Sequence, residues 1–288
     1  MRHASKLARL AIGGACAFLS ACSHGILDPQ GPVGIAEERI LIASVGVMLS
    51  IVIPTIIAIA AFAWWFRESN HRARHLPTWA YSGRIELIVW SIPVLVILLL
   101  GGVTWIGSHQ LDPAVPLTTS AAPLEIQVVA LDWKWLFIYP RSKTASVNEL
   151  FLPIQTPVHF SITSASVLNA FFIPQLGSMI YAMNGMTTQL NLQADEAGVF
   201  RGLSTHFSGD GFSDMHFQVH ALSQADFAAW IAKAGSGDPL LDDDGYRALS
   251  RQSTNMPANY RLADPELFRR IASQALPPGP GPDDARAH

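Results

Sequence analysis

The sequence has little charge and, beyond its first tenth, no cysteine. Charged residues make up 14% of the 288 positions, whereas a soluble domain carries about 25%. Half of the chain is hydrophobic (50%) and the mean hydropathy is +0.27. These values exclude a wholly disordered chain and argue against a purely cytosolic protein. A net charge of −3 and a pI near 6.3 exclude a nucleic-acid partner bound through bulk positive charge.

Only two cysteines are present, Cys16 and Cys22. Blue copper sites need a thiolate and dinuclear copper centres need bridging thiolates, because soft sulfur ligands hold and tune the metal. No cysteine follows residue 22, so neither centre can be built from the rest of the chain. We expect Cys16 to leave with a signal peptide and Cys22 to be modified, which excludes disulfides.

The first 21 residues have the pattern of an export signal. A positive segment with Arg2, Lys6 and Arg9 precedes a short apolar run over residues 10–19. The run ends in Leu19-Ser20-Ala21-Cys22, which resembles a bacterial lipobox. We therefore expect a lipoprotein signal peptide over residues 1–21 and lipidation of Cys22, with palmitate among its acyl groups. A plain signal peptide with an incidental cysteine is the alternative.

Two long uncharged runs follow, within a segment of residues 22–107. They cover residues 40–66 and 87–107 and contain 27 and 21 residues, enough for two membrane-spanning helices. Four arginines lie between them, with Glu68 beside the first: Arg67, Arg72, Arg74 and Arg84. Because positive residues stay cytoplasmic, the hairpin tip is expected in the cytoplasm and both chain ends outside.

Short alternating strands dominate the region after a linker at residues 108–122. The strand-like segments cover 125–130, 135–139, 158–163, 187–192, 199–203 and 215–220, and their spacing favours a β-sandwich or barrel over residues 108–222. Helix signals follow at Ser223 and at Asp264-Pro265, which predicts a short helical C-terminal extension over 223–275. The Pro- and Gly-rich residues 276–288 are predicted to be a disordered tail.

A few other side chains could in principle bind a metal ion or take part in catalysis. Histidines and methionines occur close together in sequence, and a Cu(I) site made from them is conceivable: His206, His216, His220, Met179, Met183 and Met186. We favour a solvent-facing strand for the histidines and gap filling for the methionines. Ser204, His206 and Asp210 make a poor hydrolase triad, since they lack a nucleophile-elbow motif.

Glu86 stands at the predicted cytoplasmic start of the second span. An ionisable residue at the edge of a membrane helix is a functional candidate, here for collecting protons from the cytoplasm. The alternative is a carboxylate favoured by the helix dipole. The residues alone do not separate these two interpretations.

Four segments resemble subunit II of the haem–copper respiratory oxidases. Residues 84–93 resemble the start of that family's second helix, residues 131–140 its aromatic segment, and residues 167–177 and 198–215 its copper-A segments. Four copper-ligand positions hold other residue types, namely Asn169, Ser204, Ser208 and Phe212. Met215 keeps its type, and His206 replaces the loop glutamate. A copper-A loop that lacks these ligands together resembles that of the ubiquinol oxidase branch of the family, the cytochrome bo type.

The resemblance implies a membrane α-hairpin plus an all-β domain, a cupredoxin-like sandwich without its copper-A site. It implies a bacterial inner-membrane complex that oxidises ubiquinol, reduces dioxygen to water and pumps protons. The haems and one copper would lie in subunit I, so this chain would be non-catalytic, bind no metal and serve as a periplasmic cap beside subunit I and further subunits. Glu86 matches the entrance of the K-type proton pathway. Trp133 and Trp135 would pack between the domain and subunit I rather than accept electrons.

Three other functions compete with this one. Subunit II of a cytochrome c oxidase is disfavoured because the thiolates are missing. A free-standing periplasm-facing lipoprotein that binds Cu(I) through Met and His predicts tight Cu(I) binding by residues 108–288. A structural envelope protein predicts purification without any haem protein.

Overall fold

The computed structural model describes residues 25–74, 76–117, 122–254 and 256–277. The predicted signal peptide, Cys22 and residues 278–288 of the predicted tail lie outside the described residues. The chain divides into two compact units, one from Glu37 to Asp112 and the other from Pro113 onward together with the residues before Glu37. Each unit is described by itself below.

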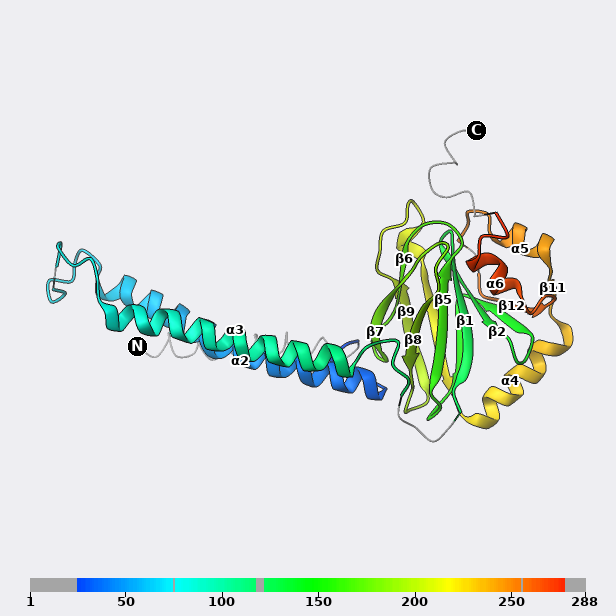
Figure 1. Ribbon diagram of the computed structural model, residues 1–288, viewed down its shortest axis with the longest axis horizontal. Helices are drawn as coiled ribbons and strands as arrows, with labels where there is room; N and C mark the ends of the chain where they lie inside the picture. Colours follow the sequence, from blue (N-terminus) through cyan, green and yellow to red (C-terminus); the bar gives the residue numbers. More distant parts are fainter. Residues whose placement is uncertain (1–24, 75, 118–121, 255, 278–288) are drawn as a thin grey trace, which may run out of the picture. The chain divides into compact units, whose positions relative to one another are not determined.

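The first unit is built from two long apolar helices, α2 (Pro32–Trp65) and α3 (Gly83–Gln110), which run side by side (Figure 1). Both are long and apolar enough to cross a membrane. The helix α2 begins before the uncharged run and includes Glu37, Glu38 and Arg39, because helical geometry continues through the charged residues. A Cβ on Gly107 would lie 2.9 Å from Cδ1 of Ile40, so glycine permits the close approach of α2 and α3.

The second unit is a sandwich of two β-sheets. One sheet has the strand order β11-β12-β3-β2-β1-β5-β8 and the other β4-β10-β9-β6-β7. The strands of the sandwich proper are β1 (Leu124–Leu131), β2 (Lys134–Tyr139), β3 (Thr144–Val147), β4 (Glu149–Pro153), β5 (Val158–Ser164), β6 (Asn169–Ile173), β7 (Gly177–Ala182), β8 (Thr188–Leu192), β9 (Gly198–Ser204) and β10 (His216–Leu222), with a 3-10 turn η1 (Phe212–Asp214) before β10.

Aromatic side chains fill the space between the two sheets. The indole of Trp135 is fully buried, with ring centroids 5.2 Å from Phe171 and 5.8 Å from Phe217. Phe171 and Phe217 stack on each other at 5.2 Å. Such rings supply much of the apolar area that stabilises a sandwich.

The C-terminal extension covers the outer face of the larger sheet. Its elements are α4 (Gln224–Gly237), β11 (Leu240–Leu241), α5 (Asp243–Leu249), β12 (Ala258–Leu262) and α6 (Leu267–Ala272). A second apolar cluster joins outward residues of β1 and β2, such as Val129 and Leu136, to Tyr246 and Phe268 of the extension. Both faces of β2 are therefore buried, which explains its unbroken apolar run.

The extension also adds two strands that the sequence analysis did not predict. Strand β12 pairs antiparallel with β3, with Tyr260 opposite Ala145, and β11 pairs with β12. The predicted fold class, a membrane α-hairpin plus an all-β sandwich with a short helical C-terminal extension, is confirmed. The extension is thus part of the sandwich as well as a cover for it.

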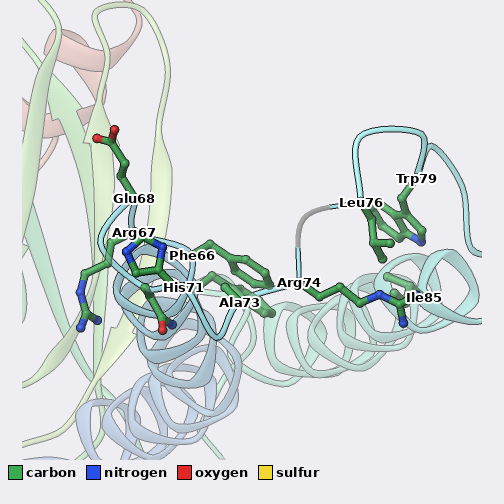
Figure 2. Close-up of a pocket in the computed structure, with 11 residues that line it drawn as sticks. Phe66, Arg67, Glu68, His71, Ala73, Arg74, Leu76, Trp79 and Ile85 are labelled. Carbon is green, nitrogen blue, oxygen red and sulfur yellow. The ribbon is translucent and has the colours of Figure 1, made fainter.

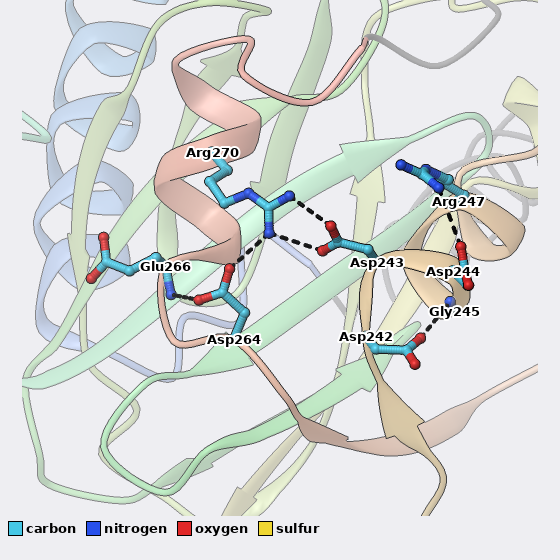
Figure 3. Close-up of polar contacts among 8 residues, drawn as sticks. All are labelled: Asp242, Asp243, Asp244, Gly245, Arg247, Asp264, Glu266 and Arg270. Atoms are coloured by element: carbon cyan, nitrogen blue, oxygen red, sulfur yellow. Dashed lines mark hydrogen bonds and ion pairs between the residues drawn. The ribbon is translucent and has the colours of Figure 1, made fainter.

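One arginine holds the helices of the extension together (Figure 3). The Arg270 guanidinium donates to the Asp243 carboxylate at 2.9 and 2.7 Å and to Asp264 at 2.9 Å. These hydrogen bonds hold the pKa of both carboxyls below the usual range. Arg270 therefore ties α6 to α5 and to the turn before α6.

Candidate functional site

Four of the copper-ligand positions of the family, three changed and one retained, meet at one end of the sandwich. Asn169 begins β6, Ser204 ends β9, and Ser208 and Met215 lie between β9 and β10. All four are at least 95% buried, with exposed fractions of 1%, 4%, 5% and 2%. We call residues 204–215 the remnant loop.

The side chains at these ligand positions are joined by hydrogen bonds to one another. The Ser204 hydroxyl donates to Oδ1 of Asn169 at 3.3 Å, and the Ser208 hydroxyl donates to Sδ of Met215 at 3.9 Å. The Ser204 amide donates to the Met215 carbonyl at 3.0 Å. Hydroxyl and amide groups are poor ligands for copper. In the described part of the chain, no group of three or more His, Cys, Asp or Glu side chains is placed to hold a metal ion.

The other two positions of the set do not join this cluster. The His206 ring is exposed and faces Tyr181 edge-on at 6.0 Å. The Phe212 ring packs against the exposed Phe207, with centroids 5.7 Å apart. The structure therefore gathers Asn169, Ser204, Ser208 and Met215, and leaves His206 and Phe212 on the outer side of the loop.

A tight turn between β1 and β2 supports the remnant loop. Trp133 has a φ of +66°, and its indole N–H donates to the Ser208 carbonyl at 3.0 Å. A Cβ on Gly211 would lie 2.3 Å from Cδ2 of Trp133, so only glycine allows the loop to rest on the indole. The sequence analysis missed this contact, although Trp133 lies in the aromatic segment that it singled out.

The expectation that Trp135 packs against another subunit is wrong. Trp135 has an exposed fraction of 0% because alternation along β2 directs it between the two sheets. A side chain inside the sandwich has no surface left for a partner.

Lys134 is buried in the same turn and contacts the C-terminal extension. Its ammonium donates to the carbonyls of Arg251 at 2.6 Å and Ser253 at 3.2 Å, and to the Ser253 hydroxyl at 2.7 Å. The carboxylate of Asp132, one turn residue away, is also buried and accepts from the Ser166 hydroxyl. The turn thus connects the remnant loop, the extension and the segment before β6.

The free energy of unfolding is expected to rise between pH 8 and about pH 10. Loss of water lowers the pKa of Lys134 to about 8, and the Asp132 charge only partly opposes this. An unfolded chain therefore binds a proton in this window that the folded chain does not, which adds up to about 3 kcal/mol. Burial raises the pKa of Tyr139 and Tyr246, so their opposing effect begins only near pH 10.

Urea unfolding of the full chain in detergent, followed by near-UV circular dichroism at pH 8, 9 and 10, measures this rise. The Lys134→Met variant should lose it, whereas Lys143→Met, at an exposed lysine, should keep it. An identical profile in the Lys134→Met variant would contradict the assignment.

Two of the side chains considered for Cu(I), those of Met179 and His220, make other contacts. Sδ of Met179 accepts a hydrogen bond from the Thr205 hydroxyl. The His220 ring stacks on Phe151 at 4.7 Å and lies 3.5 Å from the Glu149 carboxylate. His216 is exposed, whereas Phe217 and Val219 are buried, which agrees with a solvent-facing strand edge.

Glu86 lies in the first turn of α3. Its amide donates to the Ser82 carbonyl at 3.0 Å, and its side chain is exposed on this chain. A carboxylate at this end of a helix is favoured by the helix dipole. Its role in proton uptake stays a prediction.

Comparison with known proteins identifies the family. The family profile described as "Cytochrome C oxidase subunit II, periplasmic domain" matches residues 124–222. The periplasmic domain of subunit II of cytochrome oxidase from Bradyrhizobium japonicum aligns with a TM-score of 0.38 and 23% identity, over 41% of this chain and 96% of that domain.

Two curated relatives align over nearly the whole chain. Cytochrome bo(3) ubiquinol oxidase subunit 2 of Pseudomonas putida is 47% identical over 258 residues, covering 89% of this chain and 82% of that protein. Ubiquinol oxidase subunit 2 of Acetobacter aceti is 45% identical over 272 residues, covering 94% of this chain and 89% of that protein. The resemblance found in the sequence is therefore confirmed, including its cupredoxin-like sandwich, and the chain belongs to the ubiquinol oxidase subunit 2 family of the haem–copper oxidases.

Proposed function

We propose that this chain is the non-catalytic subunit II of a proton-pumping terminal ubiquinol oxidase. The complex oxidises ubiquinol and reduces dioxygen to water, with its haems and one copper in subunit I. The observation that carries the proposal is the family membership together with a copper-A loop whose ligand positions hold Asn169, Ser204 and Ser208.

The remnant loop supports a change of electron donor. Cytochrome c is water-soluble and needs an accepting metal on the periplasmic side, whereas ubiquinol delivers electrons from within the lipid. Hydrogen bonds between buried polar side chains keep the loop folded without a metal, since buried polar groups need partners. The domain therefore acts as a periplasmic cap on subunit I.

Oxygen uptake by the complex purified through a C-terminal tag on this chain tests the proposal. Ubiquinol-1 and reduced cytochrome c are offered separately, and haem and copper are counted in the same sample. Uptake with ubiquinol alone, with copper for one oxygen-reducing centre, is the expected result. Uptake driven by cytochrome c would overturn it, and purification without haem would favour an envelope or Cu(I)-binding lipoprotein.

We further propose that the chain spans the bacterial inner membrane twice with both ends in the periplasm and a lipid at Cys22. The arginines at the hairpin tip support this orientation. Glu86 then lies on the cytoplasmic side, where it would take up protons for subunit I.

The Cys22→Ser variant is expected to lose its lipid and yet stay in the membrane. One acyl chain adds little to the binding of a protein that is already held by two spanning helices. Mass spectrometry of the intact chain measures the lipid, and carbonate extraction of membranes measures retention. Release of the variant into the soluble fraction would contradict the membrane hairpin, whereas a mass that differs only by the exchange of sulfur for oxygen would contradict lipidation.

A further inference from the structure

The described residues at the tip of the hairpin line a cavity of about 950 Å³, but they do not form one anion site (Figure 2). Arg67 and Arg74 both line this cavity. Their guanidinium groups point to opposite sides of the tip in Figure 2, and that of Arg67 donates to the Trp64 carbonyl at 2.7 Å and to the Ser69 hydroxyl at 3.0 Å. One phosphate therefore cannot bind both arginines, and the cavity does not indicate a ligand.

The segment before α2 lies against the sandwich. Residues 28–34 belong to the same compact unit as the sandwich, and we call them the strap. The Gln30 amide donates to the Gln175 carbonyl at 2.7 Å, and the Gln30 carbonyl accepts from the Asp195 amide at 2.8 Å. Gln175 lies in the turn between β6 and β7, and Asp195 lies between β8 and β9. The strap therefore joins two connections of the sandwich through backbone hydrogen bonds.

The start of α2 enters the apolar core of the sandwich. Val33 and Gly34 are the buried residues of α2, and Val33 belongs to the main core cluster. The Gly34 amide donates to the Leu176 carbonyl at 3.1 Å. A Cβ on Gly177, where φ is +144°, would lie 2.6 Å from Cγ1 of Val33. Burial of the valine side chain therefore stabilises this contact in addition to its hydrogen bonds.

A glycine at position 31 permits the closest approach of the strap to the sandwich. A Cβ on Gly31 would lie 2.0 Å from the carbonyl oxygen of Gln193, which is far closer than two such atoms can approach. The next residue, Pro32, is the first residue of α2, and proline is favoured there because its φ already fits the helix. The dipeptide Gly31-Pro32 therefore suits both the contact with the sandwich and the start of the helix.

The segment that follows α3 contacts the sandwich beside the strap. The backbone amide and the side-chain amide of Asn191 both donate to the Pro113 carbonyl at 3.0 Å. Asn191 belongs to β8, which is the last strand of its sheet, and the backbone groups of such an edge strand need partners. Both segments that flank the hairpin in the chain therefore contact residues 191–195.

We propose that the strap is a second attachment between the sandwich and the hairpin, made by non-covalent contacts. The first attachment is the covalent one between Asp112 and Pro113, where the two units join. The strap continues directly into α2, so the sandwich holds the chain at both ends of the hairpin. This inference rests on the proposed role of the sandwich as a periplasmic cap, because two attachments restrain a cap more than a single linker does. A tethered segment binds at a high effective concentration, which favours its docked state.

A protease site inserted between Asp112 and Pro113 tests the strap in the full chain, purified in detergent by its C-terminal tag. After cleavage, the strap should keep the hairpin fragment bound to the tagged sandwich fragment through washing. The Gly31→Ala variant should retain at least about tenfold less hairpin fragment, which corresponds to about 1.4 kcal/mol, because its methyl group would meet the Gln193 carbonyl. The matched control is Gly46→Ala in α2, where an added Cβ would meet nothing within 4 Å outside its own helix, and it should retain the fragment in full. Near-UV circular dichroism checks that the sandwich of both variants is folded.

A free peptide with the sequence of residues 25–36 gives an independent measurement. At millimolar concentration it should displace the hairpin fragment from the cleaved chain, whereas the same peptide with Gly31→Ala should not. Loss of the hairpin fragment from the cleaved unsubstituted chain, equal retention by the Gly31→Ala variant, or no displacement by the peptide would each overturn the proposal. Neither readout uses ubiquinol or subunit I, so a failure of the strap is distinguishable from a failure of the proposed oxidase function.

Discussion

Replacing Glu86 with glutamine is expected to slow ubiquinol-driven oxygen consumption by at least about tenfold. Glutamine keeps the size of the side chain and its place in the first turn of α3 but can neither bind nor release a proton at neutral pH. Loss of a group that transfers protons commonly costs two to four orders of magnitude in rate, and partial replacement by water would reduce the effect. An oxygen electrode measures turnover, and an outside pH indicator measures proton uptake into liposomes that contain the oxidase.

The Glu68→Gln variant is the matched control. It removes a carboxylate from the same hairpin tip, but from the loop rather than from the first turn of α3. Its turnover should stay within about twofold of the unsubstituted oxidase. If Glu86 serves only the helix dipole, Glu86→Gln would cost about 0.3–1 kcal/mol of helix stability and leave turnover unchanged, and that result would remove the proton-uptake role. The ratio of haem to this chain reports whether the complex still assembles.

Replacing Trp135 with alanine is expected to destabilise the sandwich by about 3–5 kcal/mol. The indole is fully buried against two phenylalanine rings, Phe171 and Phe217, and its deletion leaves a cavity that the two sheets cannot close. Its indole nitrogen has no hydrogen-bond partner among the described residues, so the loss is one of packing. A loss of this size lowers the Tm by about 10 °C, which near-UV circular dichroism of the full chain measures.

Two further variants separate packing from other roles. Trp90→Ala removes a side chain that is 71% exposed on α3, and it should leave the unfolding of the sandwich unchanged. Trp135→Phe keeps an aromatic ring in the core and should retain ubiquinol-driven turnover. A Trp135→Phe oxidase that folds but takes up no oxygen would show that the indole has an electron-transfer role, and equal stability of Trp135→Ala would exclude the packing role.

The sequence pattern predicted those strands and helices that are specified by residues within the same short segment. Six strand segments and the helix at Ser223 were recognisable from alternation and from a capping side chain, and Ser223 does accept a hydrogen bond from the Asp226 amide. Strands β3 and β4 were not predicted, and β3 has only four residues. Strands β6 and β7 were missed because Asn169 and Gly177 at their starts interrupt the apolar pattern.

The pairing of β12 with β3 could not be predicted from either segment alone. Residues 258–262 alternate weakly, and their stability comes from hydrogen bonds to a strand more than a hundred positions earlier. The same holds for Lys134, whose acceptors belong to Arg251 and Ser253. A lysine within an apolar segment gives no local signal of where its acceptors lie.

For the candidate site, too, one part could be predicted from the sequence and another part depends on the tertiary structure. The amino-acid sequence alone determined that no thiolate copper site can form after residue 22, because a missing residue type is missing in every conformation. It also determined two helices that are long and apolar enough to cross a membrane, since length and lack of charge are local properties. Only the tertiary structure decided that the Ser204 hydroxyl donates a hydrogen bond to Asn169 and the Ser208 hydroxyl one to Met215. It also decided that the Trp133 indole supports their loop. These contacts depend on the register of β6, β9 and β10, which is set by packing across the whole sandwich.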